Sequence, residues 1–179
     1  MFGYAGRILY LDLSTSRIEE KPVSEDYAKK YLGGRGLGAK LLWDEVKAGI
    51  DPFSPENRLI FTTGPFAGTG LATSNKFILS FKSPLTGIYS FSNAGGGFGI
   101  AMKNAGYDAM VVKGEAEKPV YILIDDGKVS IEDATDLWGS GNFEVMRRIE
   151  QNLGLDVSLA SIGPAGEKLV RICLLYTSP

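Results

Sequence analysis

The sequence predicts an α+β domain, with mixed, largely antiparallel β-sheets that form a β-rich base for a few packed helices. Alternating apolar segments recur in neighbouring pairs joined by short turns, which is typical of antiparallel hairpins. The regular strand–helix alternation of a doubly wound fold is absent. A chain of 179 residues, 44% apolar and 22% charged, is long enough for one domain with a substantial core.

Each element follows from a local pattern. An apolar period of two predicts strands, spacings of three or four predict helices, and Gly, Pro or Ser clusters separate them. Ser24 is expected to cap the first helix, whose first turn is acidic. Asp126-Gly127 predicts a type I′ hairpin turn. The expected elements are strands at 6–14 and 15–23, helices at 25–32 and 37–46 with a break at 33–36, strands at 58–64, 75–82 and 88–93, a helix at 97–106, strands at 107–114, 119–125 and 128–134, a helix at 141–154 with Phe143, Val145, Met146 and Ile149 facing inward, and one or two strands within 156–172.

Two stretches of the chain echo each other. RLIFTTGPFAG (58–68) and VSLASIGPAG (157–166) are both apolar strands that end in Gly-Pro and a further Ala-Gly. This echo indicates pseudo-twofold halves. One domain is expected over residues 1–172. Residues 173–179, CLLYTSP, end abruptly after a strand that is expected to continue, so we interpret them as a truncated or non-native tail.

Composition excludes several kinds of site. The chain has no histidine and one cysteine, Cys173, so it cannot supply a Ser-His dyad, a His metal site or the thiolates of a zinc or Fe–S site. A single cysteine and the absence of a secretory signal favour the cytoplasm. A net charge of −2 and the absence of a long apolar run make nucleic acid and membranes poor partners.

Glycine is the positive signal. The stretch SNAGGGFG (92–99) holds four glycines between an expected strand and an expected helix. Glycines permit positive φ and let a phosphate approach backbone N–H groups closely, and Asn93 adds an amide that donates and accepts. A sharp turn without a ligand explains the same residues, so both interpretations stay open here.

Two further motifs have the chemistry of an anion site. GTGLATSNK (68–76) offers hydroxyls and one cation, Lys76, which begins a strand joined by one turn to the strand that ends at Asn93. The two loops can therefore face one ligand, although a solvated loop is the simpler interpretation. LGGRGLGAKLL (32–42) places Arg35 before a helix, but a packing role for its glycines is favoured.

The motifs GRILYLDLS, YLGGRGLGAKLLWDE, DPFSPENRLIFTTGPFAGTG, KSPLTG, SNAGGGFG, KNAGYDAMVVKGEAEKPVYILI, LWG and IGPAGEKLVR follow one another in this order. Together they resemble the N-terminal domain of the aldehyde ferredoxin oxidoreductase family over residues 1–172. The resemblance implies a β-rich base under a tungsten (or molybdenum) bis-pterin cofactor. It implies an enzyme that oxidises aldehydes to carboxylic acids and passes electrons through a [4Fe–4S] cluster to ferredoxin. The cluster ligands would lie in helical domains that follow this one.

The resemblance also implies site residues. Asn93 and Gly95 match the pterin-contacting Asn-x-Gly of the family, with the Asn93 backbone near a magnesium ion that bridges the two pterin phosphates. Lys76 stands where family members carry Arg or Lys for the pterin. The family's next Gly-Arg-rich cofactor segment does not follow residue 172. No catalytic residue is expected in this chain, which alone is expected to be inactive.

Other features stay open at this point. The aldehyde, the choice between tungsten and molybdenum, and the oligomeric state, a homo-oligomer included, do not follow from these residues. The alternative function is a stand-alone phosphate- or nucleotide-binding module that uses the same Gly-rich loops.

Overall fold

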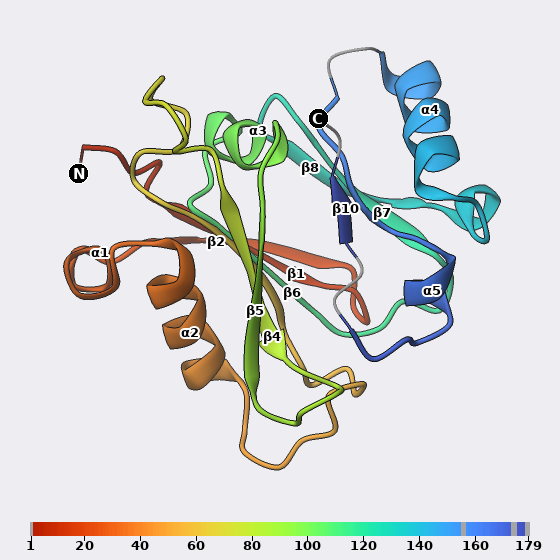
Figure 1. Ribbon diagram of the computed structural model, residues 1–179, viewed down its shortest axis with the longest axis horizontal. Helices are drawn as coiled ribbons and strands as arrows, with labels where there is room; N and C mark the ends of the chain where they lie inside the picture. The colour runs from red at the N-terminus through yellow and green to blue at the C-terminus, as the bar shows by residue number, and fades with distance from the viewer. Residues whose placement is uncertain (1, 155–156, 173–174, 178–179) are drawn as a thin grey trace.

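A six-stranded sheet organises the N-terminal part of the chain (Figure 1). The computed structural model describes residues 2–154, 157–172 and 175–177. The strand order is β2-β1-β6-β3-β4-β5, and among the described strand pairs only β1 with β6 is parallel. The predicted α+β class is therefore confirmed. The strands of this sheet are β1 (Arg7–Asp12), β2 (Arg17–Pro22), β3 (Leu59–Thr63), β4 (Phe77–Lys82), β5 (Tyr89–Ala94) and β6 (Ala109–Lys113).

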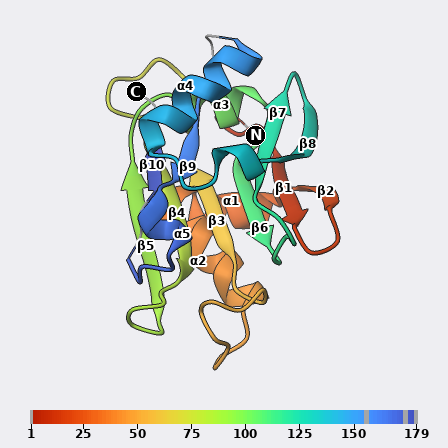
Figure 2. The same cartoon turned by 90° about the vertical axis from the view of Figure 1, so that its right-hand side faces the viewer.

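Two helices, α1 (Glu25–Tyr31) and α2 (Gly34–Glu45), cover one face of the sheet. Ser24 caps α1 as predicted, because its hydroxyl accepts a 3.1 Å hydrogen bond from the Tyr27 N–H. The apolar stripe of α2 buries Leu37 and Leu41 against the sheet. Figure 2 shows both helices behind the sheet.

The two helices are separated as predicted, but the break is shorter than 33–36, since α1 ends at Tyr31 and α2 already begins at Gly34. Glycine is a weak helix former, but here close packing requires it. A Cβ at Gly36 would lie 2.4 Å from the Tyr31 carbonyl oxygen, and one at Gly38 would lie 2.4 Å from the Ser80 hydroxyl. These glycines therefore let α2 lie directly on β4.

The other face of the sheet is covered by later elements, seen in front in Figure 2. The turn between β7 and β8 has positive φ at both Asp126 (44°) and Gly127 (81°), which confirms the type I′ hairpin. Ile122 and Ile131 of this hairpin pack against the second core of the sheet. The later elements are α3 (Phe98–Asn104), β7 (Val120–Asp125), β8 (Lys128–Asp133), the 3₁₀ turn η1 (Thr135–Leu137), α4 (Asn142–Leu153), β9 (Ala160–Ile162), α5 (Pro164–Glu167) and β10 (Leu175–Thr177).

Three details of the C-terminal part correct or limit the sequence prediction. Phe143 is 74% exposed rather than inward, because it lies about 200° around α4 from the buried Val145. Residues 168–172 form no strand, since a helical turn over 164–167 precedes them. Of residues 173–179, the segment Leu175–Thr177 pairs with β9, whereas Cys173 lies outside the described residues.

The element order of the first half returns in the second. A hairpin, a helical segment and a strand ending in Gly-Pro occur as β1–β2, α1–α2 and β3, and again as β7–β8, α4 and β9. In both halves the strand before Gly-Pro pairs antiparallel with the next strand. This order supports the predicted echo, and the twofold relation itself stays a prediction.

Asp108, at the start of β6, is a buried point of connection. Its carboxylate accepts hydrogen bonds from the N–H groups of Ala5 (3.1 Å) and Gly6 (2.6 Å) and pairs with Lys103 of α3. Its backbone oxygen accepts the Thr63 N–H at 3.0 Å, and its own N–H donates to Arg7 at 2.9 Å. One residue thus joins the N-terminal segment, β3 and α3.

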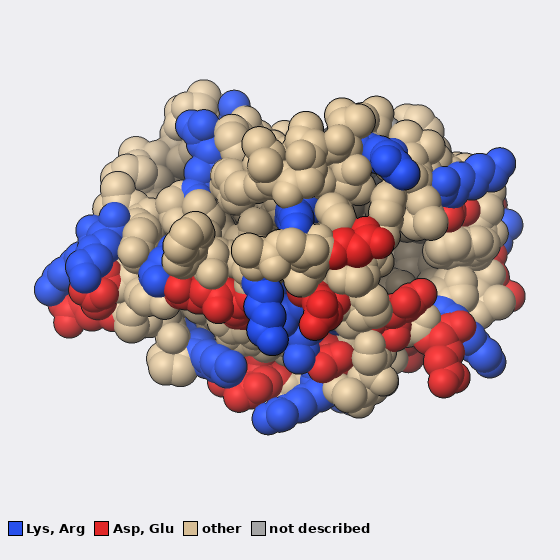
Figure 3. All heavy atoms as spheres, turned by 90° about the horizontal axis from the view of Figure 1, so that it is seen from below, with Lys and Arg blue, Asp and Glu red and all other residues tan. Residues whose placement is uncertain are grey.

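The face of the molecule that is seen from below carries both acidic and basic side chains, interspersed with one another (Figure 3). Surface ion pairs such as Lys113–Asp12 (2.9 Å) contribute little stability individually. No helix in the described part of the chain is long and apolar enough to span a membrane.

The contact between α2 and β4 can be tested with Gly38→Ala. The added Cβ meets the Ser80 side chain at 2.4–3.1 Å, so either the helix or the strand must shift. We expect a loss of about 1–3 kcal/mol in the free energy of unfolding, measured by urea unfolding of the chain. Gly141→Ala is the matched control, because a Cβ there meets nothing within 4 Å. Equal effects of both substitutions would contradict the close-contact explanation.

Asp108→Asn tests the buried connection. The change leaves the Lys103 ammonium, whose side chain is 10% exposed, without its carboxylate, and breaking a buried pair in this way costs about 3–5 kcal/mol. Urea unfolding should show that loss, and the double variant Asp108→Asn with Lys103→Met should recover part of it. A double variant no more stable than Asp108→Asn alone would show that the ion pair is not the cause.

Candidate anion-binding site

The end of β3, the start of β4 and the end of β5 meet at one end of the sheet, because the three strands are successively antiparallel. We call this the site end. The loop of residues 64–76 and the glycine segment 95–97 emerge there, at the top of Figure 1, next to α3. The two loops that sequence reasoning assigned to one ligand are therefore neighbours.

The three predicted site residues lie together at the site end. The register pairs Phe77 with Ala94 and Ile78 with Asn93, so Lys76 and Gly95 each lie one residue beyond the last pair. Lys76, Asn93 and Gly95 are all exposed. β5 is an edge strand of the described sheet, so no described strand pairs with its outer side.

The glycines after β5 have different structural reasons. Gly96 has φ of +84°, a left-handed conformation that favours glycine. A Cβ at Gly99 would lie 2.9 Å from the Asn75 carbonyl oxygen, so α3 needs a glycine to pack on the start of β4. At Gly95, by contrast, a Cβ would meet nothing within 4 Å, and φ is not positive. The described fold thus gives no reason for glycine at position 95.

Lys76 is the cation of residues 57–107 that has no partner among the described residues. Residues 57–107 contain four cations and no Asp or Glu. Arg58 pairs with Glu45 at 3.1 Å, Lys103 pairs with Asp108, and the Lys82 ammonium donates to the Ile50 carbonyl at 2.6 Å. For Lys76 the described residues supply neither an ion pair nor a hydrogen bond. Its charge is free for a ligand.

The hydroxyls of the loop before β4 are used within the loop. Thr69 donates to the Phe66 carbonyl at 2.7 Å, and Ser74 donates to the Leu71 carbonyl at 2.7 Å. Thr73 takes a positive φ of 61°, which is uncommon for a β-branched residue. The loop therefore offers a ligand its cation, Lys76, more than the hydroxyls that its sequence suggested.

The glycines of the motif around Arg35 allow close packing, which is the role that the sequence analysis favoured for them. A Cβ at Gly33 would lie 2.5 Å from the Thr63 carbonyl oxygen, so the α1–α2 corner rests on the end of β3. Arg35 itself is exposed and lies over the Phe91 ring, with 4.7 Å from the guanidinium carbon to the ring centroid. Sequence reasoning did not place this arginine at the site. The acid-free run 57–107 was the signal that could have drawn attention to nearby cations.

Tyr4 connects the N-terminal segment to the end of α1. Its hydroxyl donates to the Leu32 carbonyl at 2.6 Å, and the Lys103 ammonium lies 5.5 Å from its ring centroid. Burial, and then the negative charge of Asp108, raise the pKa of the Tyr4 phenol. The phenol therefore stays neutral at physiological pH and acts as a hydrogen-bond donor, which fixes the N-terminal segment on α1.

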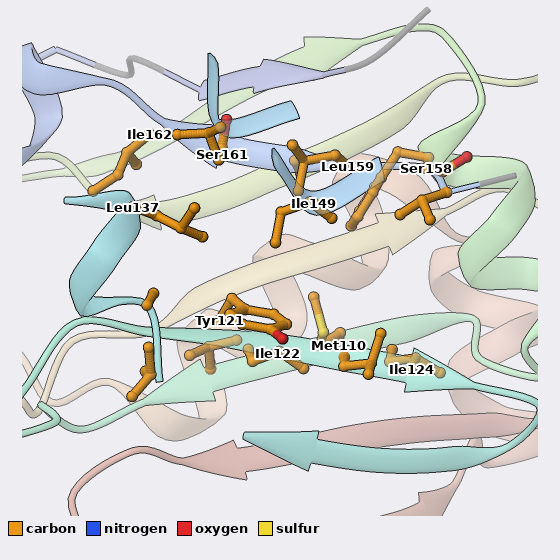
Figure 4. A pocket seen from close by; sticks show the side chains of 18 of the residues that line it. Met110, Tyr121, Ile122, Ile124, Leu137, Ile149, Ser158, Leu159, Ser161 and Ile162 are labelled. Carbon is orange, nitrogen blue, oxygen red and sulfur yellow. The ribbon is translucent and has the colours of Figure 1, made fainter. Parts of the chain in front are cut away.

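A cavity lies away from the site end, between the sheet and the later elements. This cavity of about 860 Å³ is lined mainly by aliphatic side chains, including Met110, Ile122 and Ile149 (Figure 4). Lys76, Asn93 and Gly95 do not line it. Its chemistry suits apolar contact and not an anion, so it does not compete with the site end for a phosphate.

Metal ligands are scarce in the described part of the chain. No group of three or more His, Cys, Asp or Glu side chains there is placed to hold an ion. With one cysteine in the whole chain, an Fe–S cluster cannot be ligated by this sequence alone. A cation at the site end would depend on backbone oxygens and on the ligand's own oxygens.

Comparisons with known proteins bear on the domain as a whole. The family model for the "Aldehyde ferredoxin oxidoreductase, N-terminal domain" matches residues 8–179. A tungsten-containing aldehyde ferredoxin oxidoreductase of Pyrococcus horikoshii is 49% identical over 179 residues, and the match covers 99% of this chain and 30% of that protein. An aliphatic sulfonate oxidoreductase, WOR-like subunit, of Pyrococcus furiosus is 36% identical, with 99% of this chain and 31% of that protein covered.

A solved structure is also similar. The active-site complex BamBC of benzoyl coenzyme A reductase, in complex with 1,5-dienoyl-CoA, matches with a TM-score of 0.96 and 37% identity, over 98% of this chain and 27% of that chain. The chain thus spans about 30% of the length of the curated relatives it matches. The family match includes residues 173–179, and the interpretation of that segment as a tail stays a prediction.

These matches leave the alternative of a stand-alone phosphate- or nucleotide-binding module without support, because proteins about three times as long contain this unit as one part. The family model covers residues 8–179, and the fold matches the solved structure over 98% of this chain. The chain belongs to the aldehyde ferredoxin oxidoreductase family, as an N-terminal domain of that family.

Proposed function

We propose that the site end of this domain binds the phosphate-bearing part of a tungsten or molybdenum bis-pterin cofactor within a longer oxidoreductase. That enzyme would oxidise an aldehyde to a carboxylic acid and deliver the electrons to ferredoxin, as its relatives' names indicate for them. When bound, the cofactor supplies the two-electron chemistry. This chain supplies position and electrostatics, because it has no histidine and no exposed acid at the site end.

The observation that carries the proposal is Gly95. Its backbone conformation is open to any residue, and a Cβ would enter empty space. A glycine that the fold does not require, beside an exposed amide and an unpaired cation, fits a site where a ligand lies against the backbone. Gly96 and Gly99 lack this property, since turn geometry and packing explain them.

The residues around Gly95 have complementary roles. Asn93 can donate from its amide to the pterin ring or to a phosphate, and its backbone oxygen is the group we assign to a magnesium ion between the two phosphates. The Lys76 ammonium would neutralise one phosphate as a point charge. The [4Fe–4S] cluster and the pocket for the aldehyde would lie in parts of the enzyme outside this chain, because its one cysteine cannot hold a cluster.

Gly95→Ala in the full-length protein tests the proposal. The domain should unfold as before, because the new methyl group meets no protein atom. Bound pterin and metal should fall about tenfold, which corresponds to about 1.4 kcal/mol of lost binding free energy. Metal analysis and fluorescence of the oxidised pterin, on protein expressed with tungstate and molybdate, give both quantities. Gly141→Ala is the control, and the same loss there, or none at Gly95, would refute the proposal.

Lys76 gives an independent electrostatic test. Lys76→Ala should weaken cofactor retention, and added salt should reduce the difference from the parent, because an exposed charge acts through a screened field. Lys76→Arg should retain the cofactor at least as well as the parent, since a guanidinium binds phosphate oxygens in a bidentate manner. Lys47→Ala, an exposed lysine beyond the far end of α2, serves as control. Identical retention in Lys76→Ala and Lys47→Ala would remove Lys76 from the site.

A further inference from the structure

Arg35 is a second cation at the site end, contributed by a different part of the chain. It lies in the first turn of α2, its side chain is exposed, and no described carboxylate pairs with it. Its guanidinium lies over the ring of Phe91 of β5, with 4.7 Å between the guanidinium carbon and the ring centroid. An arginine that contacts an aromatic face and no acid retains all of its N–H donors.

The packing of α2 fixes where this arginine can reach. A Cβ at Gly34 would lie 3.4 Å from Ile78, and one at Gly38 would lie 2.4 Å from the Ser80 hydroxyl, so the first turns of α2 lie over β4. Ile78 pairs with Asn93, and Ser80 pairs with Phe91. The helix therefore begins above the two β4–β5 residue pairs that contain Phe91 and Asn93.

Phe91 and Asn93 share a face of β5, because residues two apart in a strand point to the same side. At about 3.3 Å of rise per residue their Cα atoms are roughly 7 Å apart. A guanidinium resting on the Phe91 ring is thus about one residue pair from the Asn93 side chain. Phe91 restricts the long, flexible Arg35 side chain, which reduces the entropy lost when the guanidinium binds an anion.

The surrounding charges leave this guanidinium available. The acid-free run 57–107 supplies β3, β4, β5 and α3, so none of these elements offers Arg35 a competing carboxylate. Lys76 and Gly95 each follow directly on the Phe77–Ala94 pair, beyond Asn93. Asn93 is therefore accompanied by two cations that have no acidic partner, one from α2 and one from the start of β4.

We propose that Arg35 is a positioning residue for the cofactor, which binds one phosphate group through its guanidinium while Lys76 neutralises the other. This inference rests on the proposed function, because it takes a ligand with two phosphates as the occupant of the site end. It assigns Phe91 the role of holding the guanidinium in place. It also explains why a charged residue follows two glycines at the start of α2, where packing alone requires only the glycines.

The test compares Arg35→Gln, Arg35→Lys and Phe91→Leu in the full-length protein with the control Arg17→Gln, which lies on β2 at the opposite edge of the sheet. Bound pterin and metal are measured before and after dilution, together with the thermal midpoint of cofactor-free protein. We expect Arg35→Gln to lose at least about tenfold in cofactor retention, the scale of one charge-assisted hydrogen bond. Arg35→Lys should recover part of it, and Phe91→Leu should lose less than Arg35→Gln.

The outcomes separate this inference from the proposed function. Unchanged retention in Arg35→Gln, with a clear loss in Gly95→Ala, overturns the role of Arg35 and leaves the cofactor site in place. Unchanged retention in both overturns the site itself. A lowered midpoint of the cofactor-free Arg35→Gln protein without loss of retention would make Arg35 a structural cover for Phe91. Loss of retention with an unchanged midpoint supports the inference.

Discussion

The buried carboxylate of Asp108 is the constraint on which the site end depends. A buried charge is stable only when it is paired and hydrogen-bonded, and here Lys103 and two backbone N–H groups satisfy it. Because Lys103 belongs to α3 and the Asp108 backbone bonds to Thr63 of β3, the helix cannot move away from the sheet without exposing that charge. The glycine segment is therefore held between two fixed points, the β5 register and α3.

Within this rigid frame, the glycines and the cations that the fold itself does not require can be identified. Several glycines of the site end have a structural reason, either a left-handed φ or a backbone atom too close for a Cβ, whereas Gly95, like Gly64 at the start of the neighbouring loop, has neither. Of the cations at the site end, Lys103 is paired with Asp108, whereas Lys76 and Arg35 have no acidic partner among the described residues. At Gly95 the side chain is absent without a structural reason, and the unpaired charges of Lys76 and Arg35 lie nearby. This combination is expected of a preorganised site for an anion and not of a simple turn.

Local patterns predicted much of the fold and less of the site. The Ser24 cap and the Asp126-Gly127 turn were predictable because both depend on adjacent residues. The start of α2 and the outward side of Phe143 were not, since tertiary packing decides them. The adjacency of Lys76 and Gly95 followed in outline from one hairpin. The sequence offered Arg35 as a candidate anion-binding residue but favoured a packing role for its motif, because only the docking of α2 on β4 brings it to β5, and no sequence spacing encodes that contact.

The chemistry of these residues limits what the domain can contribute. Histidine, the side chain that enzymes use most often for proton transfer, is absent from the chain, and the site end offers an arginine and a lysine, an amide, and a carboxylate that is buried under an ion pair. Proteins that share this domain are named for different substrates. We therefore attribute to the domain the part of the reaction that is independent of the substrate. Under the proposed function, a fixed positive field around a phosphate-bearing cofactor would be such a part, because it would hold the reactive group in place and leave substrate choice to other surfaces.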